Sequence, residues 1–296
     1  MNSKHYHIRM NIKEKVVDLV RHRKTSLPTL PVVINNIIAT ARSEKTSAKD
    51  LANFIVNDQA ISARVLRIAN SAYYGMSKKI DSISRAIVVI GFKEIISLAL
   101  GMGIFSAFSK KGGDAPIDIT ELWKHSIGVG FAAKKIAKKT MKIADESTIL
   151  IGLLHDIGKI VFCLYFPDEY AEVMKKTPNE QTPLYKIEKE CLGLDHAEMA
   201  YLLMKQWNFP ANLIQPVRYH HNPSVCPEGE VDMAMIVNLA NFICHQAGIG
   251  HSGDNNIEID NKVLRKLGLS DENVGTLADE LESERDQVED FLAALS

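Results

Sequence analysis

The stretch Gly152-Leu-Leu-His-Asp-Ile-Gly-Lys159 places a histidine and an aspartate side by side inside a strongly apolar run. Leucine and isoleucine recur around the pair at helical spacing, so the sequence predicts one buried helix through the whole stretch. His155 and Asp156 each need a partner there, because burying an unpaired polar or charged group is costly. A divalent metal ion would satisfy both. The alternative is a hydrogen-bonded core histidine beside an aspartate that caps a helix.

The composition is that of an ordinary globular protein. The chain has 296 residues, 46% of them hydrophobic and 24% charged, enough for one large domain or two modest ones. The formal net charge of −1 provides no overall basic field that would favour nucleic acid or membrane. The longest apolar run, 95–108, is too short to cross a bilayer, and the polar N-terminus does not resemble a signal peptide. We therefore expect a cytoplasmic protein that binds no membrane.

Helical periodicity and capping residues predict helices along most of the chain and no convincing strand. Ser47 followed by Asp50 resembles a capping box, and Asp195 followed by Glu198 repeats the pattern. The run 110–116, Lys-Lys-Gly-Gly-Asp-Ala-Pro, is the best candidate for a linker. The sequence thus predicts an all-α protein with a helical lobe at 1–112, a second helical lobe at 113–250 and a helical tail at 251–296.

One predicted helix of the second lobe carries a basic face. Its lysines are Lys134, Lys135, Lys138 and Lys139. The simplest interpretation is a solvated surface, because a neutral isoelectric point does not favour nucleic-acid contact. The sequence therefore does not favour nucleic acid as a partner.

The second lobe also contains the residues that are best suited to bind a metal. In chain order they are His125, His155, Asp156, His196, His220 and His221. Each alone has an ordinary structural explanation, such as a histidine at the negative end of a helix. Neutral imidazoles and a carboxylate suit Fe, Mn or Zn better than Mg or Ca, which prefer oxygen ligands. We expect the six residues to converge on one pocket that holds one or two such ions, the alternative being a pocket of hydrogen-bonded histidines.

Three segments of the first half resemble the HDOD domain: Leu27-Pro-Thr-Leu-Pro31, 55–75 and 84–91. The most specific is 55–75, Ile-Val-Asn-Asp-Gln-Ala-Ile-Ser-Ala-Arg-Val-Leu-Arg-Ile-Ala-Asn-Ser-Ala-Tyr-Tyr-Gly. The ordered histidines and His-Asp-Ile-Gly-Lys resemble the dinuclear branch of the HD superfamily of metal-dependent phosphohydrolases, which includes the HD-GYP phosphodiesterases. The resemblance runs from about Leu27 to about Ala247. It implies a bacterial, all-helical, two-lobed protein of signalling or regulation.

The resemblance also implies roles for single residues. The six residues above would bind metal, and Asp156 and Lys159 would be catalytic in an active member, whose ions bind phosphate and activate water. Two features depart from that pattern. Asn241 stands where the branch closes its site with an aspartate, and its carbonyl can bind a metal but brings no charge. The run after His220 and His221 lacks the Gly-Tyr-Pro signature.

Two functions remain open on the sequence. The favoured one is a regulatory HDOD protein that binds a signalling protein or a nucleotide and keeps a metal site with little or no catalysis. The alternative is a metal-dependent phosphohydrolase or phosphodiesterase that acts on a nucleotide or a cyclic dinucleotide. The retained ligands favour the enzyme, whereas Asn241, the missing signature and the HDOD-like first half favour regulation.

Overall fold

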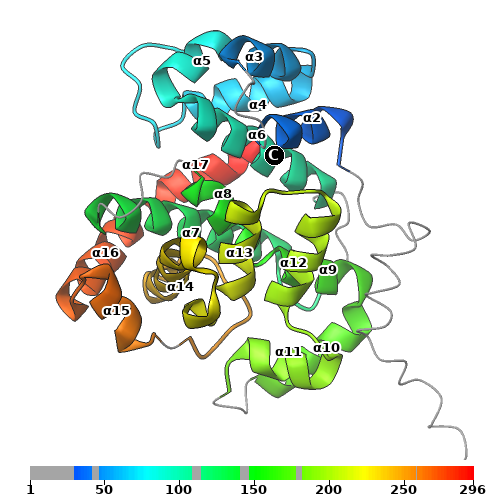
Figure 1. Ribbon diagram of the computed structural model, residues 1–296, viewed down its shortest axis with the longest axis vertical. Helices are drawn as coiled ribbons and strands as arrows, with labels where there is room; N and C mark the ends of the chain where they lie inside the picture. The colour runs from blue at the N-terminus through cyan, green and yellow to red at the C-terminus, as the bar shows by residue number, and fades with distance from the viewer. Residues whose placement is uncertain (1–29, 42–46, 109–114, 141–146, 178–181, 258) are drawn as a thin grey trace, which may run out of the picture.

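The computed structural model describes residues 30–41, 47–108, 115–140, 147–177, 182–257 and 259–296. Every regular element in these ranges is a helix, which confirms the all-α prediction (Figure 1). The predicted linker lies mostly outside the described residues, so the boundary between the lobes stays a prediction.

In the first lobe, four helices pack against a fifth, α6. They are α2 (Val32–Ala41), α3 (Ala48–Val56), α4 (Gln59–Ala69), α5 (Ile83–Ile90) and α6 (Phe92–Phe108). The capping box predicted at Ser47 and Asp50 forms both of its bonds and begins α3. At Gly91, whose φ is 113°, the chain bends by 120° between α5 and α6. A positive φ of this kind favours glycine, so this residue sets the angle between the two helices.

The second lobe is built on the long helix α7 (Ile119–Thr140). Around it lie α8 (Thr148–His155), α9 (Ile157–Tyr165), α10 (Pro167–Lys176), α11 (Leu184–Leu192), α12 (His196–Gln206), α13 (Ala211–Tyr219) and α14 (Val231–Gln246). The backbones of α7 and α8 touch, because a Cβ on Gly152 would lie 2.3 Å from the backbone nitrogen of Gly130. At Asp195 half of the predicted capping box forms: its side chain accepts from the N–H of Glu198, whose carboxylate binds Lys189 instead.

The prediction of one helix through 152–159 is wrong. α8 ends at His155 and α9 begins at Ile157, while Asp156 lies between them with φ −103° and ψ 10°. The side chain of Asp156 makes no capping hydrogen bond, so the alternative of an aspartate whose carboxylate caps a helix is not seen either. The break coincides with a close approach of α9 and α12, because a Cβ on Gly158 would lie 2.0 Å from the carbonyl oxygen of His196. This approach places Asp156 beside the start of α12.

The apolar stretch Thr148–Tyr165 is long and apolar enough to cross a membrane by length and composition alone. It contains the break at Asp156, and 89% of it is buried inside the protein. The bent pair α5 and α6, which includes the run 95–108, passes the same test only when both helices are joined. These stretches form the core of the fold.

The C-terminal helices are α15 (Asn261–Leu267), α16 (Asp271–Ser283) and α17 (Arg285–Leu295). α17 lies between the two lobes (Figure 1) and packs against both α7 and α4. The ring of Phe291 lies 6.0 Å from that of Tyr73 in the first lobe and 5.4 Å from that of Phe131 on α7. The predicted tail therefore joins the lobes.

The basic face of α7 was predicted to be simply solvated surface. This prediction is wrong in part, because two of its lysines bind carboxylates of other elements. Lys134 Nζ lies 2.6 Å from Oε1 of Glu94, a first-lobe residue that is only 2% exposed. Tyr74 donates to the same oxygen at 2.8 Å. Lys135 Nζ lies 2.8 Å from Oε1 of Glu284. These contacts tie α7 to the first lobe and to the C-terminal helices.

Replacing Lys134 with methionine is expected to destabilise the protein by about 1–2 kcal/mol, because Glu94 keeps its buried charge and loses its cation. The value is below that of a fully buried pair, since the Lys134 side chain is 40% exposed. Urea unfolding of Lys134→Met against Lys138→Met, an exposed neighbour on the same helix, measures the difference. Equal stability of the two variants would contradict the prediction.

Candidate metal centre

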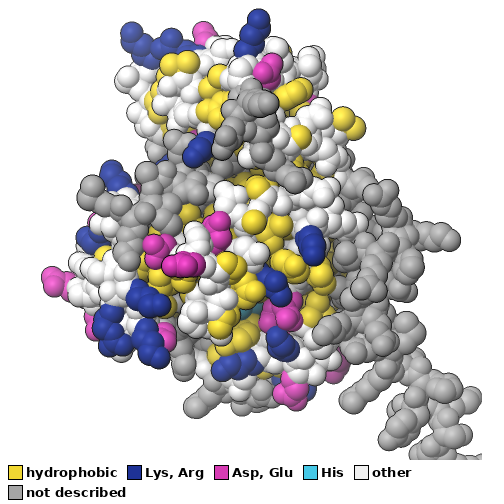
Figure 2. Space-filling model, viewed as in Figure 1, with side chains coloured by type: hydrophobic (Ala, Val, Ile, Leu, Met, Phe, Trp, Pro, Cys, Tyr) yellow, Lys and Arg dark blue, Asp and Glu magenta, His cyan; other side chains and the backbone are white. Residues whose placement is uncertain are grey.

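The predicted metal ligands meet where α7, the α8–α9 break, α12 and the end of α13 come together. They are His125 within α7, His155 at the end of α8, Asp156 at the break, His196 at the start of α12, and His220 and His221 directly after α13. His221 is half-buried and the others are buried. Figure 2 accordingly shows almost no histidine on the visible face.

The ligands form two groups, in each of which the ligand atoms lie within 4.8 Å of one another. One group is His196, His220 and His221, and the other is His125, His155 and Asp156. Asp156 turns one oxygen toward each group: Oδ1 lies 3.1 Å from Nε2 of His196, and Oδ2 lies 3.4 Å from Nε2 of His155. The carboxylate of Asp156 therefore lies between the two groups.

The ring orientations of two histidines favour metal binding. Nδ1–H of His155 donates to the carbonyl of Gly152 at 2.7 Å, and Nδ1–H of His220 donates to the carbonyl of Val217 at 2.7 Å. Because a carbonyl only accepts, Nε2 of each ring carries the lone pair. These two Nε2 atoms are buried without a hydrogen-bond partner among the described residues, and Oδ1 of Asp156 has the ion-pair contact with His196 as its one partner there. Buried polar atoms are normally paired, so the two orphaned nitrogens beside this carboxylate fit a metal ion.

Glu188 on α11 supports the centre, and the sequence analysis missed it. Its Oε2 accepts from Nδ1–H of His196 at 2.6 Å and from the backbone N–H of His196 at 2.8 Å. Its Oε1 accepts from the hydroxyl of Tyr170 at 2.7 Å. Metal-binding histidines commonly donate their second N–H to a carboxylate, which holds the ring in place. The sequence offered one signal for Glu188. It lies four residues after Leu184, so the two side chains share one face of a helix, and the apolar residue predicts that this face is buried.

Asn241 faces the centre from α14, as the resemblance implied, but its contact is with a histidine. Nε2–H of His125 donates to Oδ1 of Asn241 at 2.8 Å, and both side chains are buried. In this arrangement Nε2 of His125 is occupied by its hydrogen bond to the amide of Asn241. The group of His125, His155 and Asp156 therefore has an amide where a second carboxylate would add negative charge.

Lys159 also lies inside the centre, where it is 1% exposed. Its Nζ lies 2.8 Å from Oδ2 of Asp156. The ammonium group thus neutralises one carboxylate oxygen and leaves Oδ1 for a metal. The ion pair does not test the catalytic role that the resemblance implied for Lys159, so that role stays a prediction.

The pKa values of the histidines are set by burial and by nearby charges. Burial lowers the pKa of His125 to about 3, and it lowers the pKa of His220 and His221 well below the usual range. Burial alone would also lower the pKa of His196, but the charges of Glu188 and Asp156 outweigh it and raise the pKa to about 9. A metal ion that binds His196 Nε2 must displace a proton, so metal binding is expected to release protons.

Asp156 and Lys159 both favour their charged forms. Burial alone would raise the pKa of Asp156, but its interactions with His155, Lys159 and His196 hold it well below the usual range. Burial alone would lower the pKa of Lys159, but the carboxylates of Asp156, Asp254 and Glu188 raise it. Asp156 is therefore available as an anionic ligand at neutral pH.

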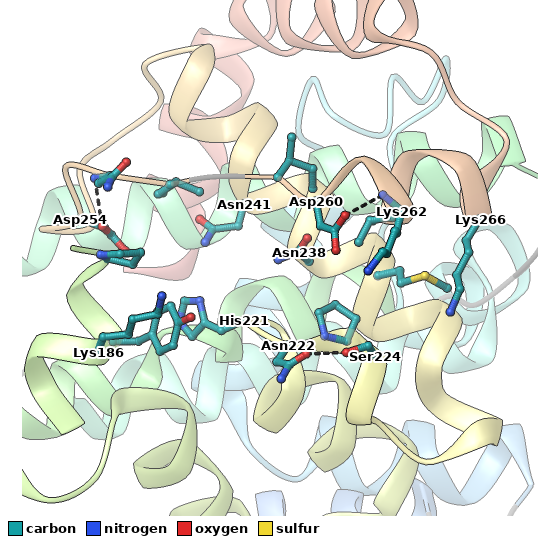
Figure 3. Close-up of a pocket in the computed structure, with 18 residues that line it drawn as sticks. Lys186, His221, Asn222, Ser224, Asn238, Asn241, Asp254, Asp260, Lys262 and Lys266 are labelled. Atoms are coloured by element: carbon teal, nitrogen blue, oxygen red, sulfur yellow. Dashed lines mark hydrogen bonds between the residues drawn. The ribbon is translucent and has the colours of Figure 1, made fainter. Parts of the chain in front are cut away.

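A cavity of about 320 Å³ opens beside the centre, with His221 and Asn241 in its wall (Figure 3). Its polar lining includes Lys186, Asn222, Ser224, Asn238, Asp254, Asp260, Lys262 and Lys266. The volume of the cavity lies at the small end of the range found for ligand sites in proteins. It therefore offers a route by which a small polar molecule can reach the centre.

The HDOD domain model matches residues 27–223, two thirds of the chain. The chain belongs to the HDOD family. This confirms the resemblance in the first half, and the match also contains all six predicted histidine and aspartate ligands. Residues after 223, including Asn241 and most of one cavity wall, lie beyond the part of this HDOD protein that the family model matches.

Two curated relatives are themselves uncharacterized. A protein of Treponema pallidum is 26% identical over 77% of this chain and 44% of its own length. YuxH of Bacillus subtilis is 28% identical over 49% of this chain and 37% of its own length. This chain therefore spans less than half the length of either relative.

Three crystal structures share the fold. An HDOD domain protein from Geobacter sulfurreducens has a TM-score of 0.75 and 24% identity, covering 96% of this chain and 98% of its own. A candidate signal transduction protein from Marinobacter aquaeolei VT8 has a TM-score of 0.76 and 22% identity, covering 97% and 62%. A candidate phosphohydrolase from Shewanella amazonensis SB2B has a TM-score of 0.72 and 22% identity, covering 97% and 98%. At these identities the similarity concerns the fold alone.

Proposed function

We propose that this HDOD protein is a bacterial regulatory protein whose histidine–aspartate centre binds one or two divalent transition-metal ions, with little or no catalysis. The observation that carries the proposal is the pair of buried Nε2 atoms of His155 and His220, which have no hydrogen-bond partner among the described residues, beside the buried carboxylate of Asp156. The cavity beside the centre would bind a nucleotide or contact a signalling protein. A bound ion supplies positive charge that attracts phosphate or carboxylate oxygens.

The chain's own residues would prepare the centre for the ion. Glu188 holds the ring of His196 so that Nε2 faces Asp156 and His221. Lys159 holds Oδ2 of Asp156, which fixes the orientation of the carboxylate. The group of His196, His220 and His221 with Asp156 is the more complete of the two, because Asn241 adds no charge to the group of His125. We therefore expect one ion to bind more tightly than the other.

Removing the metal is expected to lower the melting temperature, because an ion that binds only the folded protein stabilises it. Elemental analysis of the protein as purified is expected to find Fe, Mn or Zn in at least a one-to-one ratio. Thermal unfolding before and after a chelator, followed by addition of each metal, measures the effect. Absence of metal, together with an unchanged melting temperature on adding metal, would favour the alternative of hydrogen-bonded histidines.

A metal-dependent phosphohydrolase is the second candidate, because Asp156 and Lys159 meet at the centre beside an open cavity. We expect hydrolysis of generic phosphodiesters and of cyclic dinucleotides to be weak or absent, since Asn241 leaves one ion poorly neutralised. The assay uses metal-loaded protein and the Asp156→Ala variant. A strong rate with a cyclic dinucleotide that disappears in the variant would establish the enzyme and overturn the regulatory proposal.

We further propose that the protein acts in the cytoplasm without membrane or nucleic acid. The net charge of −1 provides no overall positive charge that would attract a membrane or nucleic acid. Lys134 and Lys135 are engaged in ion pairs within the protein, which makes them less suited to bind nucleic acid.

A further inference from the structure

One wall of the cavity is built by residues beyond the family match, which ends at residue 223. The loop after α14 and helix α15 contribute Asp254, Asn256, Ile257, Ile259, Asp260, Lys262, Val263 and Lys266. The opposite wall includes Tyr185, Lys186, His221 and Asn222 from matched elements. A ligand that fills the cavity therefore contacts both residues within the family match and residues beyond it.

Asp254 is a buried carboxylate in this added wall, with 3% of its surface exposed. Its Oδ1 accepts from the backbone N–H of Asn256 at 3.2 Å and from that of Leu184 at 3.4 Å. These bonds hold the carboxylate in place and use one oxygen only. Because a buried charge is costly without partners, the second oxygen, Oδ2, is suited to accept a hydrogen bond from a ligand N–H or O–H.

Three asparagines in the cavity wall use only part of their hydrogen-bonding capacity within the protein. Asn241 accepts from His125 through Oδ1, which leaves its amide N–H groups. Asn238 donates to the carbonyl of His220 at 2.7 Å, which leaves its Oδ1. Asn222 accepts from the hydroxyl of Ser224 at 2.6 Å, which leaves its N–H groups. A planar ligand edge with neighbouring donors and acceptors, such as a nucleobase, complements this array.

Two lysines, Lys262 and Lys266, lie at the other end of the cavity beside Asp260, while Lys186 lies at the end of Asp254 (Figure 3). Asn238 and Asn241 lie between the two ends. The ammonium group of Lys262 forms no ion pair with any residue that the structure describes. A lysine in this position binds a phosphate group as a point charge.

We infer that the cavity binds a single nucleoside monophosphate whose base presents N–H donors, with the phosphate at Lys262 and the base edge at Asn241 and Asp254. The inference rests on the proposed function, since it names the ligand of the same centre. Guanine fits best because its two adjacent donors, N1–H and the exocyclic N–H, can both reach the single oxygen Oδ2 of Asp254, whereas uracil presents one N–H between two carbonyls. A cyclic dinucleotide carries two bases and two phosphates, which exceeds a cavity of about 320 Å³.

The test is calorimetric titration of metal-loaded, full-length protein with GMP, UMP, guanosine, inorganic phosphate and cyclic di-GMP. GMP is expected to bind at least about tenfold more tightly than each of the others, which corresponds to one charged hydrogen bond or phosphate contact. Asp254→Asn keeps the acceptor Oδ1, so it is expected to fold. It should remove the preference for GMP over UMP and leave the metal content unchanged.

Lys262→Gln is expected to weaken the binding of GMP about tenfold and to leave the binding of guanosine unchanged, because only the nucleotide carries a phosphate. Lys138→Gln, on an exposed part of α7, is the matched control and should bind GMP as the parent does.

Metal-loaded protein that binds no mononucleotide at millimolar concentration would overturn this inference and leave the metal centre standing. Equal affinity for GMP and UMP, tighter binding of cyclic di-GMP, or loss of metal in Asp254→Asn would overturn it as well. A protein that takes up no metal contradicts the proposed function instead, which separates the two failures.

Discussion

Replacing Asp156 with asparagine is expected to remove nearly all bound metal and to destabilise the protein by about 3–5 kcal/mol even when a chelator is present. Metal is lost because Asp156 is the carboxylate that faces both histidine groups. Stability is lost because Lys159, 1% exposed and 2.8 Å from Asp156, keeps its charge without a counter-ion. Elemental analysis and urea unfolding measure the two effects separately.

The double variant Asp156→Asn/Lys159→Met is the control for this prediction. It removes both members of the buried ion pair, so it is expected to recover a large part of the stability and none of the metal binding. Normal metal content in either variant that lacks Asp156 would show that the ion is held elsewhere.

Replacing Asn241 with aspartate is expected to raise the metal content by up to one ion per chain and to allow phosphohydrolase activity to appear. The side chains are nearly isosteric, and a carboxylate binds divalent cations far more strongly than an amide carbonyl does. Oδ1 of Asn241 already lies 2.8 Å from Nε2 of His125, so the new charge would add a second carboxylate to the group of His125. Metal content and melting temperature of Asn241→Asp beside the parent provide the test.

Asn238→Asp is the matched control, because Asn238 lies on the same helix but donates to the carbonyl of His220. Its substitution should not raise the metal content. The competing explanation of Asn241 is a residue that only bonds its neighbours between helices. A lower melting temperature of Asn241→Asp with unchanged metal content would support that explanation, because the variant would then bury an unpaired charge.

Much of the fold could be predicted because its signals are local. The capping box of Ser47 and Asp50 and the helices of the C-terminal segment depend on residues a few positions apart. The break at Asp156 could not be predicted, since the apolar pattern of α8 continues through α9 without a proline. The close approach of Gly158 and His196, which accompanies the break, joins residues from different helices.

The candidate ligands were also predictable in identity and order, because the His, His-Asp, His, His-His pattern is visible along the chain. Their division into two groups was not, and neither was the contact between Asn241 and His125. Glu188 has no motif of its own and becomes important only because α11 brings it against His196. The same holds for Lys134, because its ion pair joins α7 to the buried Glu94 of the first lobe and has no signal in the local sequence.

By itself, then, the sequence determined an all-helical HDOD protein and the residue types of one metal-type centre, because helical periodicity, caps and motif order are encoded over short distances. The tertiary structure alone decided which oxygen and nitrogen atoms face one another, which lysines are paired, and how the C-terminal segment closes the cavity. Those outcomes depend on the packing of helices that are remote in sequence, where burial turns an ordinary polar side chain into one that needs a specific partner.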